Sequence, residues 1–103
     1  MSLPVALIAT LDTKGPEVAY LRDRLSALGV PSIVIDTGIL GEPVGITPDV
    51  SHADLAEFGG ITLEQLQNAG TRGDAVALMR GFVVDYVDRL WREGRIAGGI
   101  AIG

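Results

Sequence analysis

Two short apolar runs, separated by a helical segment, constrain the fold of this chain most strongly. Residues 4–10 (PVALIAT) and 31–36 (PSIVID) lack the polar alternation of a half-solvated strand, so each predicts a strand that is covered on both faces. Between them, apolar residues recur on one helical face: Val18, Leu21, Leu25 and Leu28. Strand, helix and strand within about thirty residues form a βαβ unit, so the sheet is expected to be parallel.

The remaining elements extend this unit. Pro16 is expected in the first turn of the first helix, which leaves residues 10–15 as a loop. Residues 37–48 hold three glycines and two prolines and predict a second loop. Capping patterns, Ser51-x-x-Asp54 and Thr62-x-x-Gln65, open two short helices. A long helix over 73–93 and a strand over 98–103 complete an α/β, three-layer Rossmann-like parallel sheet.

The composition excludes several classes of function. The 103 residues carry 8 Lys and Arg against 13 Asp and Glu, a net charge of -5, which disfavours nucleic acids and anionic membranes as partners. There is no cysteine, and one histidine, His52, cannot form a zinc cluster. His52 itself is expected to face solvent. No apolar run is long enough to span a bilayer and no signal sequence is recognisable, so a cytoplasmic protein is expected.

Ligands of open parallel sheets bind beyond the carboxyl ends of the strands. After the first strand, Asp12, Thr13 and Lys14 precede a helix, where free N–H groups and a lysine favour an anion such as phosphate. Alternatively, Asp12 or Thr13 caps the helix and Lys14 lies in solvent. After the second strand, Asp36 could bind ribose hydroxyls or begin a turn.

Other polar residues also leave alternatives open. Arg72 could reach a ligand phosphate or pair with Asp74 at the start of the long helix. Asp12 and Asp36 could hold Mg²⁺ together with bound phosphates. Neither G-x-G-x-x-G nor G-x-x-x-x-G-K-[ST] occurs, so a Rossmann dehydrogenase and a P-loop NTPase are not indicated. Trp91 and Phe82 are expected to be core or interface anchors.

Four segments resemble the N-terminal part of the tomato mosaic virus resistance protein family, whose bacterial members form an uncharacterised protein family with an ATP-binding domain. They are ALIATLDTKGPE (6–17), VIDTGILGEP (34–43), the Arg72-Gly73 helix entry and GRIAGGIAIG (94–103). The resemblance implies a nucleotide-binding domain over residues 4–103. The lead over residues 1–3 is interpreted from its own Ser-Leu as a cloning scar. The resemblance also implies that the chain is truncated, because family members continue into a glycine-rich loop.

The same resemblance implies ATP, with or without Mg²⁺, as the ligand. It assigns ATP contacts to Asp12, Thr13 and Lys14, and extends the site to Thr37, Gly38, Arg72 and Gly103. Two alternatives stay open. One is a non-catalytic interaction module, a homodimer paired through the final strand. The other is an enzyme fragment acting on a phosphorylated or carboxylated metabolite, with Asp12 as acid or base.

Overall fold

Three parallel strands form one open sheet in the computed structural model, which describes residues 2–103. Met1 of the three-residue lead therefore lies outside the described residues. The strands run in the spatial order β2-β1-β3: β1 (Val5–Ala9), β2 (Ser32–Asp36) and β3 (Gly98–Ile102). Ala9 pairs with Asp36 on one side and with Ile102 on the other, so the carboxyl ends of the strands are level. The expected parallel α/β fold is confirmed.

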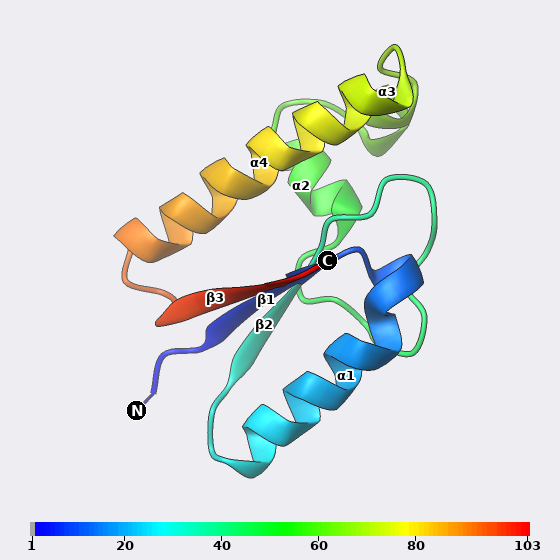
Figure 1. Cartoon of the computed structure of the whole chain (residues 1–103). Coiled ribbons are helices and arrows are strands. Elements are labelled where there is room, and N and C mark those ends of the chain that lie inside the picture. Colours follow the sequence, from blue (N-terminus) through cyan, green and yellow to red (C-terminus); the bar gives the residue numbers. More distant parts are fainter. Residues whose placement is uncertain (1) are drawn as a thin grey trace.

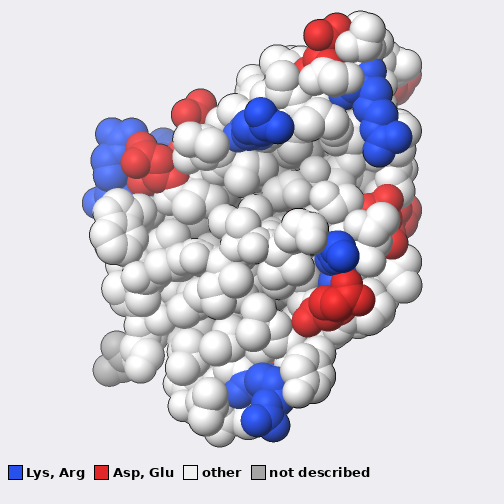
Figure 2. Space-filling view, viewed as in Figure 1, with Lys and Arg blue, Asp and Glu red and all other residues white. Residues whose placement is uncertain are grey.

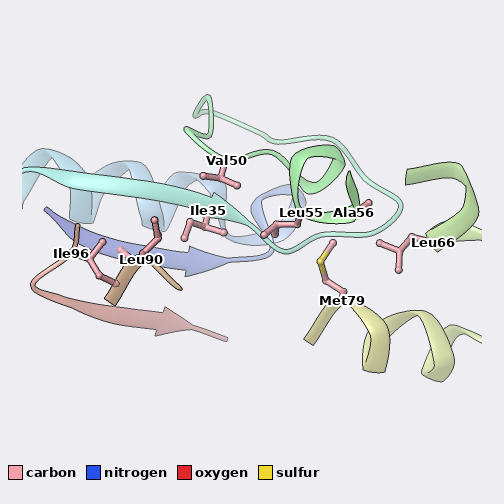
Figure 3. Packing of buried hydrophobic residues seen from close by; sticks show 9 residues of the cluster. Ile35, Val50, Leu55, Ala56, Leu66, Met79, Leu90 and Ile96 are labelled. Atoms are coloured by element: carbon pink, nitrogen blue, oxygen red, sulfur yellow. The ribbon is translucent and has the colours of Figure 1, made fainter. Parts of the chain in front are cut away.

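Helices cover both faces of this sheet (Figure 1). One face packs against α1 (Leu11–Ala27), through a core cluster that includes Leu7, Val18 and Val34. The other face packs against α2 (His52–Phe58) and α4 (Arg72–Arg92), with α3 (Leu63–Gln67) against both helices. Figure 3 shows Leu55 of α2 and Met79 of α4 pointing toward one another in this second core. Because neighbouring strand residues enter opposite cores, the strands need no polar alternation.

The start of α1 differs from the sequence prediction. The helix begins at Leu11, directly after Thr10, so the expected loop over 10–15 forms its first turns. Lys14 already donates its backbone N–H to the carbonyl of Thr10 at 2.8 Å. Pro16 lies inside the helix instead of in its first turn. Gly15 permits this, because it lacks the Cβ that would otherwise clash with the proline ring in helical geometry.

The loop over residues 37–50 packs back onto the elements around it. Its end returns to the sheet, where Asp36 donates its N–H to the carbonyl of Val50 at 2.9 Å. Its middle packs on the start of α1, where the N–H of Val44 donates to the carbonyl of Leu11 at 3.1 Å. The contact is so close that a Cβ on Gly15 would lie 1.8 Å from the Val44 oxygen. The predicted irregular loop is confirmed, and it is anchored at both points.

Capping boxes begin three of the helices. Those at Ser51 and Thr62 form as predicted. A third, not foreseen, begins α4: the Thr71 hydroxyl accepts from the N–H of Asp74 at 3.2 Å, and the Asp74 carboxylate accepts from the N–H of Thr71 at 3.0 Å. Asp74 therefore caps the helix instead of pairing with Arg72, which is the first helical residue.

The side of the molecule that carries β3 is largely uncharged. Figure 2 shows few charged side chains across the middle of this view, where Figure 1 places β3 between α4 and α1. Of the two expected aromatic anchors, Phe82 packs against the core, whereas Trp91 is 59% exposed. Within residues 2–103 no helix is both long and apolar enough to cross a membrane.

Substituting two helical glycines tests the contact between α1 and the loop. Gly15→Ala should lower the free energy of unfolding by about 1–3 kcal/mol, because the new methyl group meets the backbone at Val44. The matched control is Gly81→Ala in α4, where a Cβ meets nothing within 4 Å. Alanine should stabilise that position by about 1 kcal/mol. Urea unfolding measures both; equal stability of the two variants would contradict this packing.

Candidate functional site

A pocket of about 540 Å³ opens beyond the carboxyl ends of β1 and β2, between the loop after β2 and the first half of α4. We call residues 37–40, which line one side, the loop wall. The α4 wall comprises Arg72, Val76, Met79, Arg80 and Val83, and Asp12 of α1 lies at the polar end with Thr10. This is the position at which open parallel sheets bind ligands.

Asp36 organises the base of this pocket without lining it. Its side chain is 1% exposed, and Oδ1 accepts hydrogen bonds from the N–H of Leu11 at 3.2 Å and of Gly38 at 2.9 Å. The Leu11 N–H is one of the free donors at the start of α1, so Asp36 caps that helix from the neighbouring strand. The turn interpretation of Asp36 therefore holds. The expected cap by Asp12 or Thr13 is wrong, because the N-cap residue is Thr10, whose side chain makes no capping bond.

Asp12 contrasts with Asp36. It is the second residue of α1, and its Oδ1 is buried with no hydrogen-bond partner among residues 2–103. The carboxylate packs tightly under the loop, since a Cβ on Gly41 would lie 2.3 Å from Oδ2. A buried acceptor without a donor costs free energy, which the positive end of the helix offsets only in part. Oδ1 of Asp12 is thus a buried acceptor that has no donor among residues 2–103.

Arg72 and Arg80 supply the positive charge of the pocket. Both line it, and neither forms an ion pair within the described part of the chain. They stand eight residues apart on α4, which corresponds to about 12 Å along the helix axis. Arg80 was not foreseen, although a spacing of eight residues, a little over two helical turns, could have indicated a shared side with Arg72.

The pocket brings together four of the seven predicted contact residues: Asp12, Thr37, Gly38 and Arg72. Thr13, Lys14 and Gly103 do not line it. Because Thr13 and Lys14 lie in the helix, each residue turns by about 100°, and Lys14 projects about 200° around the axis from Asp12. Gly103 follows β3, on the far side of β1 from the loop wall.

Two side chains that the sequence analysis did not assign to the site also contact the loop wall. The side-chain N–H of Gln67 in α3 donates a hydrogen bond to the carbonyl oxygen of Ile39, with Nε2 and the oxygen 2.7 Å apart. His52, expected to face solvent, is only 4% exposed, and its Nδ1 lies 3.0 Å from the carbonyl oxygen of Gly38. The prediction for His52 is wrong because the loop over 37–50 folds over the start of α2. No pattern local to residue 52 signals that burial.

The residues around the pocket offer one carboxylate for a cation. Among residues 2–103 no group of three or more His, Asp and Glu side chains could hold a metal ion. Asp36 is 1% exposed and does not line the pocket, and its Oδ1 accepts two backbone N–H groups. Asp12 remains, and one carboxylate with phosphate oxygens and water is a common ligand set for Mg²⁺.

The structure is a parallel α/β domain with a pocket at its strand ends that is lined mainly by apolar residues, together with Asp12, Arg72 and Arg80. The chain belongs to an uncharacterised protein family: the sequence model of the uncharacterised protein family (UPF0261) N-terminal domain matches residues 3–103. The bacterial uncharacterised family expected from the sequence is therefore confirmed.

Curated relatives are longer than this chain. The UPF0261 protein of Clostridium tetani is 34% identical over 103 residues, which cover 100% of this chain and 25% of the relative. UPF0261 proteins of Brucella suis and Brucella melitensis are each 33% identical over 99 residues, 96% of this chain and 23% of the relative. The chain thus spans about a quarter of the length of these relatives. No solved structure matches it.

The two aspartates should respond differently to substitution. Asp36→Ala leaves the N–H groups of Leu11 and Gly38 without their acceptor and should lower the free energy of unfolding by about 2–3 kcal/mol. Asp12→Asn should change it by less than about 1 kcal/mol, because relief of the buried charge opposes the loss of a favourable helix-end interaction. Thermal or urea unfolding compares them. A larger loss for Asp12→Asn than for Asp36→Ala would contradict these assignments.

Proposed function

We propose that the pocket binds a nucleotide, with ATP as the first candidate among phosphorylated small molecules. The observation that carries this proposal is that two exposed arginine residues, Arg72 and Arg80, line the pocket and have no ion-pair partner in the described chain. The chain has only 8 basic residues against 13 acidic ones. Two cations in one pocket of an acidic protein favour a small anionic ligand.

The α4 wall suits a ligand with a charged and an apolar part. Guanidinium groups bind phosphate oxygens through paired N–H donors, so Arg72 and Arg80 would hold the phosphates. The side chains of Val76, Met79 and Val83 present an apolar surface on the same helix. If the planar base of a nucleotide packed on this surface, the apolar area of both would be removed from water, which favours binding.

The polar end of the pocket complements the rest of a nucleotide. The carboxylate of Asp12 would accept a ribose hydroxyl or hold Mg²⁺ together with phosphate oxygens. The hydroxyl groups of Thr10 and Thr37 line the same pocket, with their oxygens 3.4 Å apart. The hydroxyl that accepts in this pair keeps its O–H and would donate it to the ligand. Bound Mg²⁺ would supply charge neutralisation for the phosphates.

The resemblance to the tomato mosaic virus resistance protein family supports ATP over other phosphorylated ligands. It rests on the segments at 6–17, 34–43 and 94–103 and on the helix entry at Arg72, and it also proposes Thr13, Lys14 and Gly103 as contacts. Since the relatives are about four times as long, a site completed by further residues is part of this proposal. Binding is proposed here for the domain, and no reaction is assigned.

Calorimetry with ATP, with and without Mg²⁺, tests the proposal. Arg72→Gln and Arg80→Gln should each weaken binding about ten- to hundredfold, which corresponds to the loss of a charged hydrogen bond of about 1.5–3 kcal/mol. Arg24→Gln in the last turn of α1 is the matched control, because it removes the same charge outside the pocket and should leave the affinity within about twofold.

Two results would count against this account. A loss of affinity larger in Lys14→Gln than in Arg72→Gln would move the phosphates to the start of α1. Absence of ATP binding to the unaltered chain would refute nucleotide binding by this domain.

A further inference from the structure

His52, the one histidine of the chain, is buried behind the loop wall and does not line the pocket. Its ring lies at the first residue of α2, with Nδ1 3.0 Å from the carbonyl oxygen of Gly38. A carbonyl oxygen can only accept a hydrogen bond, so Nδ1 carries the proton in this contact. Gly38 itself lines the pocket, so a single residue separates the imidazole ring from the pocket.

The hydrogen bonds around Gly38 show what the imidazole adds. The N–H of Thr37 donates to the carbonyl of Ala9 at 2.9 Å, and the N–H of Gly38 donates to Asp36 Oδ1 at 2.9 Å. These bonds tie the beginning of the loop wall to the sheet. The carbonyl oxygen of Gly38 takes no part in these bonds, and His52 Nδ1 is the group that contacts it.

The second ring nitrogen faces the same loop. His52 Nε2 lies 3.8 Å from Oε1 of Glu42, whose side chain is 81% exposed. With the proton on Nδ1 of the neutral ring, Nε2 is an acceptor and gains no hydrogen bond from this carboxylate, so the contact with Gly38 is the hydrogen bond that the ring makes. A polar ring is costly to bury unless its hydrogen bonds are made, so the bond to the Gly38 carbonyl stabilises the buried ring and the loop together.

We propose that His52 is a positioning residue of the pocket, whose Nδ1–H fixes the Gly38 carbonyl and so sets the geometry of the loop wall. The ligand role of that wall rests on the proposed function. The positioning itself concerns the ligand-free chain and is tested without any ligand.

The first measurement is the tautomer of His52 in the unaltered chain, read from the ¹⁵N chemical shifts of its ring. Protonated Nδ1 with unprotonated Nε2 in the neutral ring is expected. The opposite tautomer would overturn the proposal, because Nδ1 could then not donate to Gly38.

The second measurement compares two variants by amide hydrogen exchange. His52→Leu should accelerate exchange at Gly38 and Thr37 about five- to tenfold relative to amides in the middle of β1, as expected for the loss of one hydrogen bond. In His52→Asn the side-chain nitrogen stands as many bonds from the backbone as Nδ1, so exchange should return to within about twofold of the unaltered chain.

Equal acceleration in His52→Asn and His52→Leu would show that the ring only fills space, and would overturn the proposal. If His52→Leu does not fold, His52→Asn decides alone: slow exchange at Gly38 supports the proposal and fast exchange overturns it. ATP affinity should also fall about fivefold in His52→Leu and recover in His52→Asn. Absence of ATP binding to the unaltered chain would refute the proposed function while the tautomer and exchange results still judge His52.

Discussion

The buried carboxylate of Asp36 is the contact on which the strand ends, the first helix and the pocket all depend. One oxygen accepts the N–H of Leu11 from α1 and the N–H of Gly38 from the loop. Because the cap of α1 comes from the neighbouring strand, the helix can begin one residue after β1 without a connecting loop. The same oxygen fixes Gly38 beside Asp12, so the two carboxylates meet at the edge of the sheet.

Local patterns predicted most of the fold. The apolar runs at 4–10 and 31–36 predicted buried parallel strands, and Ser51 and Thr62 predicted helix starts, because strand covering and capping boxes depend on residues close in sequence. The start of α1 was not predicted. Its cap lies 25 residues away in the chain, and Pro16 suggested a later start than the one that Asp36 and Gly15 permit.

The candidate site, like the fold, was predicted where it depends on local patterns and missed where it depends on contacts between distant segments. The rule that ligands bind at strand ends pointed to Asp12, and the family resemblance added Thr37, Gly38 and Arg72. These four residues line the pocket. Lys14 was expected there because its segment was predicted to be a loop and because the resemblance assigns it an ATP contact. In the helix, its side chain projects away from that of Asp12. Burial of His52 depends on how a long irregular loop folds over α2, which neither periodicity nor propensity describes.

The most direct measurement is a titration of the ¹⁵N-labelled chain with ATP, followed by backbone amide chemical shifts. Binding in the pocket predicts saturable changes grouped at Thr10, Thr37, Gly38 and the first turns of α4, with little change along the free edge of β3. Changes centred on β3 or on the far end of α1, with the pocket amides unaffected, would contradict the account.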